Sequence, residues 1–314
     1  MRKLALGVAS CILAVGCSAP LGPTPATSAQ PFRAVHATIP QSRLPLVGVY
    51  EAGAPRSWAP LATFSSAAGV APGIAAYYSG WGEGFPAAFA RQAWSHRAYV
   101  LVQIEPRATT CAKIAAGRSD AYLRSYAAAV RSFGHPVIIS FAHEPNGPWY
   151  PWGSSHTSAA AYVAAWRHIV DVFRSQGADN VTWLWVVNAG RLSLLNGRYP
   201  GASYIDWIGV TGYYQAIWSD FASSDLAATI SYARNLAPGK PTIIDETGVA
   251  PGPRRPHQIS NVFTGAVADD LDAVVYFDIR QSGRLYNQDW RLEGDPAALT
   301  AFREASAAYI RQVG

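Results

Sequence analysis

Two short segments of the sequence carry glutamates whose surroundings suit acid–base chemistry. The first, SFAHEPNGPWYPWG at residues 140–153, contains His143, Glu144, Trp149 and Trp152. The second, PTIIDETGVAP at residues 241–251, places Glu246 after an apolar run. Two carboxyl groups, one kept protonated and one ionised, can break a glycosidic bond by protonating the leaving oxygen and stabilising the positive centre. Glu144 and Glu246 are therefore candidate catalytic residues of a glycosidase.

Each of these residues also has a purely structural interpretation. A glutamate after a strand can cap a helix or form an ion pair, and a histidine beside an apolar run often belongs to the core. We interpret the glutamates as catalytic because they follow separate apolar runs and one lies beside several tryptophans. His143 is then expected to hydrogen-bond the substrate or the nucleophile. At least one of Trp149 and Trp152 is expected to pack internally, and one to offer its flat face to a sugar ring.

Eight short apolar runs, separated by longer amphipathic segments, must position these residues. The runs are VGVYE, GIAAYYS, AYVLVQIE, PVIISFAHE, VTWLWVVN, IDWIGVTGY, PTIIDE and AVVYFDI. The clearest amphipathic segments are residues 118–133, 157–176, 222–236 and 296–312. Near-continuous Val, Ile and Leu are typical of parallel strands covered on both faces. Eight such units in about 270 residues predict a single (β/α)8 barrel. An open doubly wound sheet is disfavoured, because VGVYEAGAP lacks the GxGxxG spacing of a phosphate-binding turn.

The carboxyl ends of all strands of a (β/α)8 barrel meet at one mouth, where active sites lie. The residues expected there are Glu51, Trp81, Glu105, His143 with Glu144, Asn188, Tyr213, Glu246 and Asp278. Those expected to bind substrate are Asn188, Tyr213, Trp81 and, from the last loop, Trp290. Asn188 could instead cap a turn, and Trp290 could be a surface residue. A hydrogen bond from Tyr213 would keep Glu246 ionised, whereas Asp278 is expected to be structural.

The first residues have the features of an export signal. MRK supplies positive charge, and the apolar stretch LALGVASCILAVG is too short for a membrane span. It ends at AVGC, which resembles a bacterial lipobox with Leu13 one place upstream of the usual position. We expect residues 1–17 to be a lipoprotein signal peptide with Cys17 lipidated; a simple secretory signal is the alternative. Residues 18–41, rich in Pro, Ser, Thr and Ala, are expected to be a flexible tether, and residues 42–314 the barrel domain.

The composition excludes several classes of protein. Half of the residues are apolar and 14% are charged, so a packed core is expected and disorder is not. The formal net charge is +5 without a run of Lys or Arg, which argues against a nucleic-acid partner. Cys11 and Cys17 lie in the signal, so Cys111 has no disulfide partner and is expected to be a structural thiol. No His, Asp or Cys cluster has metal spacing, and no metal or cofactor is expected.

These motifs resemble those of glycoside hydrolase family 26, in which a His-Glu pair ends the fourth strand and is followed by Asn-Gly and Trp-Gly. The corresponding pairs are His143-Glu144, Asn146-Gly147 and Trp152-Gly153. The resemblance implies that Glu144 is the acid/base. IIDETG is similar to the family's nucleophile segment, which places the nucleophile at Glu246, and WIGVTGYY to its sixth strand, which places Tyr213 beside it. NQDWRLEGDPAALTAFREA is like the closing stretch of many members, so the resemblance runs from about Leu46 to the end.

The family resemblance implies a (β/α)8 barrel, retention of configuration and substrates that are mostly β-1,4-mannans. Some members of the family cut mixed-linkage β-1,3-1,4-glucan or xylan. The loop prolines Pro145, Pro148 and Pro151 depart from many mannanases and leave the choice of sugar open. A tethered domain without a binding module also fits an enzyme that trims the cell's own exopolysaccharide.

A hypothesis from another class is a non-catalytic polysaccharide-binding lipoprotein, which the presence of both glutamates disfavours. The expected partner is a β-linked polysaccharide or oligosaccharide, bound by a monomer. Contact with the membrane is expected only through the N-terminal lipid anchor, on the outer face of the cell membrane. If Cys17 is not lipidated, the protein is expected to be secreted.

Overall fold

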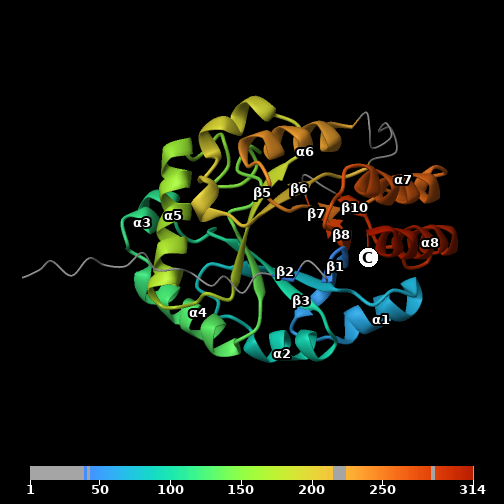
Figure 1. The fold of residues 1–314 in the computed structure, drawn as a ribbon, viewed down its shortest axis with the longest axis horizontal. Coiled ribbons are helices and arrows are strands. Elements are labelled where there is room, and N and C mark those ends of the chain that lie inside the picture. Colours follow the sequence, from blue (N-terminus) through green and yellow to red (C-terminus); the bar gives the residue numbers. More distant parts are fainter. Residues whose placement is uncertain (1–38, 41–42, 215–223, 284–286, 314) are drawn as a thin grey trace, which may run out of the picture. The chain divides into compact units, whose positions relative to one another are not determined.

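Eight parallel strands pair in sequence order, and the last strand pairs with the first to close a barrel (Figure 1). A computed structural model describes residues 39–40, 43–214, 224–283 and 287–313. The strands are β1 Leu46–Pro55, β2 Ile74–Gly80, β3 Tyr99–Glu105, β4 Val137–Phe141, β5 Val181–Asn188, β6 Trp207–Thr211, β7 Thr242–Thr247 and β8 Ala273–Asp278. Each strand overlaps one of the eight apolar runs, so the (β/α)8 fold predicted from the sequence is confirmed.

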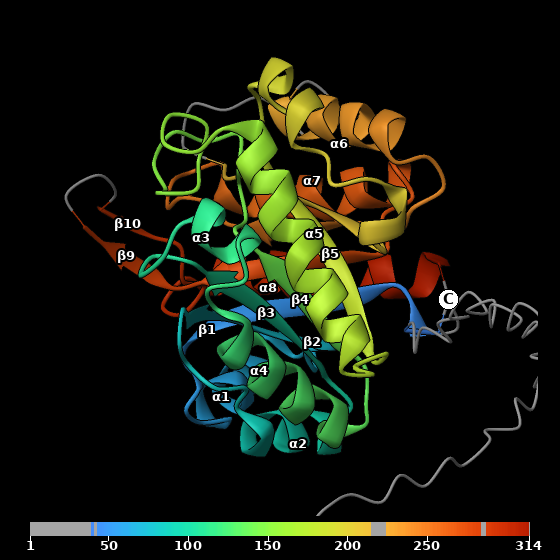
Figure 2. The same cartoon turned by 90° about the vertical axis from the view of Figure 1, so that its left-hand side faces the viewer.

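Helices surround the barrel and cover the outer faces of the strands (Figure 1). They are α1 Ala59–Ala68, α2 Ala87–Ser95, α3 Cys111–Ala115, α4 Asp120–Phe133, α5 Ala159–Ser175, α6 Asp225–Leu236, α7 Arg255–Ala268 and α8 Pro296–Val313. Short 3-10 turns between β5 and β6 are η2 Leu192–Leu194, η3 Asn196–Arg198 and η4 Ala202–Tyr204. After β8, the strands β9 Arg280–Ser282 and β10 Asn287–Asp289 form an antiparallel pair that projects from the barrel (Figure 2).

Local capping explains where several of the predicted helices begin and end. The hydroxyl oxygen of Ser158 accepts the Ala161 N–H at 3.2 Å, and that of Ser224 accepts the Ala227 N–H at 3.4 Å. These contacts satisfy backbone donors that have no partner inside the first turn of a helix. Helix α4 ends at Phe133, and the next residue, Gly134, has φ of 75°, a left-handed conformation that glycine adopts without a side-chain clash.

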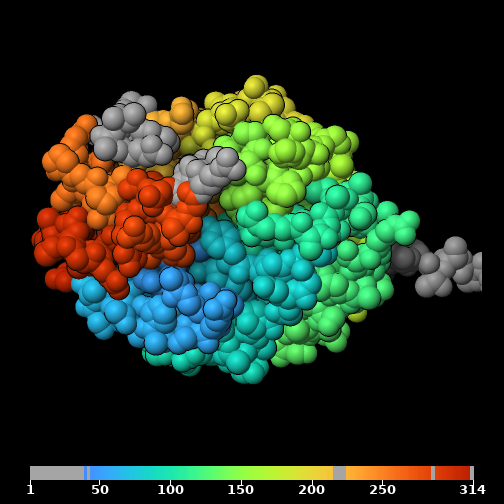
Figure 3. Space-filling model, turned by 180° about the vertical axis from the view of Figure 1, so that it is seen from behind, coloured from blue at the N-terminus to red at the C-terminus, as the bar shows by residue number. Residues whose placement is uncertain are grey.

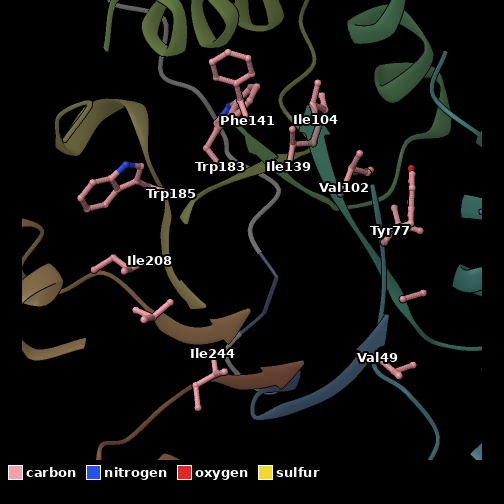
Figure 4. Packing of buried hydrophobic residues seen from close by; sticks show 14 of the residues in the cluster. Val49, Tyr77, Val102, Ile104, Ile139, Phe141, Trp183, Trp185, Ile208 and Ile244 are labelled. Atoms are coloured by element: carbon pink, nitrogen blue, oxygen red, sulfur yellow. The ribbon is translucent and has the colours of Figure 1, made fainter. Parts of the chain in front are cut away.

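The strands are buried on both faces, which explains their continuous apolar runs. Outward-pointing residues such as Val49, Ile139 and Ile244 pack under the helices (Figure 4). Inward-pointing residues fill the lumen, and they include Tyr50, Leu101, Ile138, Val186, Ile243 and Val275. Because the lumen is packed with side chains, only the two ends of the barrel are open to a ligand.

One strand departs from regular pairing at a place that matters for the site. Along β6 and β7, Val210 pairs with Ile244 and the next residue, Thr211, pairs with Glu246. Asp245 is therefore an extra residue with no partner on β6. The pairing of β7 with β8 is irregular over the same stretch. Such a β-bulge breaks the alternation of side chains and redirects those that follow it.

One residue of the expected tether packs against the barrel. Ile39, which falls in the expected tether, is 4% exposed and packs in the lumen cluster. The expected boundary between tether and barrel at residue 42 stays a prediction, with Ile39 as a packed side chain on its tether side. In space, segments from the two ends of the barrel domain, such as α1 and α8, lie side by side, as the adjoining blue and red regions of Figure 3 show. None of the helices in the described residues is long and apolar enough to cross a membrane.

Candidate active site

A cavity of about 460 Å³ opens where the strands end, and both candidate glutamates line it. The lining residues are Arg107, Glu144, Trp149, Tyr150, Asn188, Ala189, Arg191, Gly212, Tyr213, Asp225, Glu246, Gln281 and Trp290. They come from the ends of β4 to β7 and the loops that follow them, from the loop after β3, from the start of α6, and from β9 and the residue after β10. The structure thus brings Glu144, Glu246, Trp149, Asn188, Tyr213 and Trp290 together, as the sequence predicts.

Glu144 lies just beyond β4 rather than at its last residue. The strand ends at Phe141, three residues earlier than expected, and the backbone then turns through two left-handed residues. Ala142 has φ of 49° and Glu144 has φ of 52°, conformations that are strained for residues with side chains. The Glu144 N–H still donates to the Val186 carbonyl of β5 at 3.0 Å. This backbone path fixes the carboxyl group at the mouth of the barrel.

Both carboxyl oxygens of Glu144 accept hydrogen bonds from side chains. The Asn188 amide donates to Oε1 and the Trp149 indole N–H donates to Oε2, each at 2.8 Å. Asn188 is held in turn by Asn146, whose side chain accepts the Asn188 N–H at 2.9 Å and donates to the Asn188 carbonyl at 2.8 Å. Asn146 therefore acts on the carboxyl group through Asn188.

Gly147 makes room for Trp149 to reach Glu144. A Cβ atom at position 147 would lie 2.3 Å from the Trp149 ring, closer than side-chain atoms can approach. The glycine of the Asn146-Gly147 pair thus has a steric role, because the absence of a side chain lets the Trp149 indole lie beside the Glu144 carboxyl group. Trp149 is only partly buried and also lines the cavity, so it is the tryptophan of this loop that a ligand can reach.

Glu246 accepts hydrogen bonds from two phenols. Tyr213, beyond β6, donates to Oε1, and Tyr78 of β2 donates to Oε2. The contact with Tyr213 is the one that the sequence predicts. Tyr78 was missed, because it is the second of two adjacent tyrosines and alternation alone does not tell which of the two faces the lumen. Burial and the Glu246 charge hold the pKa values of both phenols well above the usual value, so both remain donors.

The electrostatics of the two glutamates are linked. Burial raises the pKa of Glu144 to about 7, although the Asn188 and Trp149 donors oppose the shift. Burial and then the charge of Glu144 raise the pKa of Glu246 to about 8, opposed by the Tyr213 and Tyr78 donors. Two nearby buried carboxyl groups disfavour a second negative charge, so we treat them as a pair that shares one proton around neutral pH.

His143 and Trp152 lie behind the site rather than in the cavity. His143 is 1% exposed, and its ring is 4.8 Å from that of Tyr150 and 5.6 Å from that of Tyr78. Burial and the Arg107 charge lower the pKa of His143 to about 3, so the imidazole is neutral. Trp152 is also 1% exposed and donates its indole N–H to the His143 carbonyl at 2.6 Å. The expectation that Trp152 binds substrate is therefore wrong; it packs in the core and fixes the loop.

Two further tryptophans, Trp81 and Trp290, pack against other aromatic side chains. Trp81 packs against Tyr122, with ring centroids 4.9 Å apart, and against Phe141 on the helix-facing side of β4. It thus packs against its neighbours and does not line this cavity, and its role in substrate binding stays a prediction. Trp290 is 2% exposed but forms part of the cavity wall, where its ring lies 4.6 Å from that of Tyr213. It is a buried support for Tyr213 and not a surface residue.

Arg107 adds a charged group that the sequence analysis did not single out. It pairs with both carboxylate oxygens of Glu105, at 2.8 and 2.9 Å. Its guanidinium group lies 5.1 Å from the Tyr150 ring centroid and 5.4 Å from that of Trp152. Glu105 is thereby held beside the site by an ion pair, and its charge contributes to the raised pKa values of Glu144 and Glu246.

Glu51 and Asp278 form a second carboxyl pair, on residues of β1 and β8 that pair with each other. Burial and the nearby Asp278 raise the pKa of Glu51 to about 10. Asp278 accepts the Leu292 N–H at 2.6 Å, which suits the structural role expected for it. Within the described residues, no group of three or more His, Cys, Asp or Glu side chains could hold a metal ion. Cys111 is buried, and burial raises the pKa of its thiol to about 12.

The fold and the cavity define a class of protein: a (β/α)8 barrel whose mouth holds two buried, hydrogen-bonded glutamates. The sequence model of glycosyl hydrolase family 26 matches residues 120–243. Endoglucanase H of Acetivibrio thermocellus is 31% identical over 234 residues, which are 70% of this chain and 25% of that protein. Mannan endo-1,4-beta-mannosidase A and B of Caldalkalibacillus mannanilyticus is 26% identical over 179 residues, which are 55% of this chain and 32% of that protein. The chain therefore spans about a quarter to a third of the length of these curated relatives.

Solved structures have the same fold. A GH26 beta-mannanase from Bacteroides ovatus superposes with a TM-score of 0.62 at 16% identity, over 85% of this chain and 89% of that chain. The catalytic domain of an endo-beta-1,4-mannanase from Bacillus sp. JAMB-750 gives a TM-score of 0.64 at 17% identity, over 86% of this chain and 87% of that chain. The family model and the curated relatives support assigning the chain to glycosyl hydrolase family 26, and the solved structures, at 16% and 17% identity, show the shared fold alone.

Proposed function

We propose that this protein is a retaining endo-β-glycosidase that hydrolyses a β-linked polysaccharide, most favourably β-1,4-mannan. The observation that carries the proposal is the pair of buried glutamates, Glu144 and Glu246, in one cavity at the carboxyl ends of the strands. Their shared environment keeps one proton on the pair, and the reaction requires that combination of an acid and a carboxylate.

The first chemical step uses both carboxyl groups at once. The Glu246 carboxylate attacks the anomeric carbon, while Glu144 gives its proton to the oxygen of the leaving sugar. This step breaks the glycosidic bond and forms a glycosyl ester on Glu246. The phenols of Tyr213 and Tyr78 stabilise the ionised form of Glu246, because each donates a hydrogen bond to one of its two oxygens. When one oxygen bonds to the anomeric carbon and loses its hydrogen bond, the other oxygen keeps its own.

The second step regenerates the enzyme. A water molecule attacks the anomeric carbon through its oxygen, and Glu144, now ionised, takes a proton from that water. The bond between the anomeric carbon and Glu246 breaks in the same step. Asn188 and Trp149 stabilise the ionised form of Glu144 that acts as base in this step. The two inversions return the sugar to its starting configuration. Trp149 and Tyr150 provide aromatic surface on one wall of the cavity, which suits a pyranose ring.

Two polysaccharides, a mannan and a β-glucan, are the leading candidates for the substrate. Mannan is favoured by relatives that are named mannan endo-1,4-beta-mannosidases, from Caldalkalibacillus mannanilyticus and Bacillus subtilis. A β-glucan is favoured by the relative from Acetivibrio thermocellus, which is named an endoglucanase and matches 70% of this chain. Xylan and a self-made exopolysaccharide remain further substrates of the same chemistry.

The test is a product screen of the purified protein on β-mannan, galactomannan, mixed-linkage β-glucan and xylan. We expect new reducing ends from one of these polymers, formed with the β configuration when the products are followed immediately by proton NMR. Glu246→Ala, purified in the same way, is the control for contaminating enzymes. Turnover with α-configured first products would contradict the retaining mechanism, and no turnover of any polymer would contradict the proposed function.

A further inference from the structure

Directly before Glu246 lies a second carboxyl group, Asp245, that the proposed reaction does not use. Asp245 is fully buried, and burial followed by the Glu246 and Glu144 charges raises its pKa well above the usual value. Its Oδ2 accepts a hydrogen bond from the Gln103 amide of β3 at 2.7 Å, and its Oδ1 faces the Thr211 hydroxyl at 3.5 Å. A buried acid normally needs partners of this kind, because burying an unpaired polar group costs free energy.

The bulge in β7 explains how two adjacent residues both point inward. In a regular strand, neighbouring side chains lie on opposite faces, so Asp245 would face the helices if Glu246 faced the mouth. Asp245 is the extra residue of the bulge, which restores the inward direction for Glu246. The neighbouring strand accommodates it: a Cβ atom at Gly209 of β6 would lie 2.8 Å from Asp245 Oδ1.

A chain of contacts leads from Asp245 back to the carboxyl group of Glu246. Gln103 Nε2, which binds Asp245, also donates to the Tyr50 hydroxyl at 3.0 Å. The Tyr50 ring stacks on Tyr78, with centroids 5.1 Å apart and planes at 26°. Tyr78 donates its hydroxyl to Glu246 Oε2. These side chains come from β7, β3, β1 and β2, so the contacts tie four strands together beneath Glu246.

We propose that Asp245 is a positioning residue for Glu246: it anchors the bulge of β7 to Gln103 and, through Tyr50 and Tyr78, sets the orientation of the Glu246 carboxylate. This inference rests on the proposed glycosidase function of the same site. Asp245 touches no cavity surface and acts only through these neighbours. A carboxylate that is displaced by about 1 Å from the line of attack loses on the order of 100-fold in rate.

Asp245 acts as a neutral acid in this arrangement. The groups that face it are Glu246 of β7, Glu144 after β4, Tyr50 of β1, Gln103 of β3 and Thr211 of β6. None of them is a cation, and two are carboxyl groups that repel a further negative charge. Asn at position 245 should therefore preserve the arrangement, because its amide oxygen can accept the same hydrogen bond from Gln103.

The test compares Asp245→Ala, Asp245→Asn, Gln103→Met and the double variant Asp245→Ala/Gln103→Met on a substrate that the wild type hydrolyses. The matched control is Ile243→Ala, which removes a lumen side chain two residues earlier on the same strand. We expect Asp245→Ala to lower kcat about 100-fold with KM within threefold. Asp245→Asn should keep kcat within fivefold of the wild type, with an unchanged pH profile. Ile243→Ala should lose thermal stability but keep kcat within threefold.

The double variant distinguishes a shared network from two independent defects. If Asp245 and Gln103 act together, the combined loss should be no larger than the larger single loss. A multiplicative loss, a kcat above one-tenth of wild type in Asp245→Ala, or an Asp245→Asn variant no better than Asp245→Ala would each overturn the proposal. Should Asp245→Ala fail to fold, Gln103→Met tests the same contact from its other side, and a kcat close to wild type there would also overturn it. A wild type that cleaves no polymer would instead count against the proposed function.

Discussion

Trp149 donates its indole N–H to Oε2 of Glu144 at 2.8 Å, although the two residues are only five apart in the chain. The loop between them must therefore turn back sharply. At Gly147 the Trp149 ring leaves no room for a side chain. The donor favours the ionised form of Glu144, which acts as the base in the second step of the proposed reaction.

We predict that Gly147→Ala lowers activity at least tenfold, because the new Cβ would meet the Trp149 ring at 2.3 Å and displace the indole from Glu144. Overpacking of this kind also costs about 1–3 kcal/mol of stability. The measurements are kcat/KM and the midpoint of thermal unfolding. Gly84→Ala is the control, since a Cβ there meets nothing within 4 Å. Equal behaviour of the two variants would contradict the steric role of Gly147.

The two glutamates should fail in different ways when they are removed. Glu246→Ala should abolish turnover of every substrate, since no glycosyl ester can form. Glu144→Ala should be most impaired on substrates with poor leaving groups, because an activated aryl glycoside needs little protonation. Azide should then restore turnover of Glu144→Ala and give a β-glycosyl azide. A Glu144→Ala variant that is equally inactive on both kinds of substrate, with no azide product, would assign Glu144 a different role.

Removing either phenol from Glu246 should shift the pH dependence in a defined direction. Tyr78→Phe and Tyr213→Phe each remove a donor that lowers the pKa of Glu246, so that pKa should rise above about 8. Activity requires ionised Glu246, and the acidic limb of the kcat profile should therefore move to higher pH, with kcat reduced about 10- to 100-fold at pH 6. Tyr199→Phe is the control, because its buried hydroxyl has no partner among the described residues. An acidic limb that does not move in either variant would contradict the prediction that these two phenols lower the pKa of Glu246.

The raised pKa of Glu246 also predicts how stability depends on pH. A carboxyl group whose pKa rises on folding binds its proton more tightly in the folded state, so its contribution to stability falls as pH rises from about 4.5 to about 8. Glu246→Gln cannot ionise and avoids this loss. Its melting temperature should exceed that of the wild type by a few degrees more at pH 8 than at pH 5, about 2–4 °C for each kcal/mol. The same increment in melting temperature for Glu246→Gln at both pH values would contradict the prediction.

The N-terminal anchor is a proposal that lies outside the described residues. If Cys17 is the lipidated residue, Cys17→Ser should block processing or release the protein from membranes. Fractionation of cells that express the two forms gives the answer, with Cys111→Ser as a control that leaves the signal intact. A secreted protein would show the same distribution for all three forms.

The barrel was predictable because its strands are buried on both faces and therefore appear as eight separate apolar runs. The two glutamates were predictable because each follows such a run. The position of Glu144 was less so, since the left-handed turns at Ala142 and Glu144 extend the chain beyond β4 without a glycine to mark them. Position along the strand could not tell which side chain faces the mouth, and Tyr78 was missed for that reason.

The tryptophans of the loop after β4 also show that residue type and spacing do not tell which side chain lines the cavity. Trp149 and Trp152 are three residues apart in one loop, and their residue type is the same, yet one lines the cavity and the other is 1% exposed. The difference comes from long-range packing: Trp152 lies against Tyr150 and the Arg107 guanidinium, with ring centroids 4.6 Å apart in the first pair. Likewise, the β-bulge at Asp245 depends on the pairing of three strands and leaves no mark in the sequence of β7 alone.

The filled lumen beneath Glu246 has a consequence for the order of events in the proposed reaction. Tyr50, Gln103 and Asp245 are all fully buried, so the barrel offers no passage from below. A water molecule can approach the glycosyl ester only from the mouth, along the route by which the leaving sugar departs. Hydrolysis must then wait until that sugar has gone. A sugar hydroxyl that arrives first would accept the glycosyl group from Glu246 in place of water, so concentrated oligosaccharide should divert the enzyme from cutting chains to joining them.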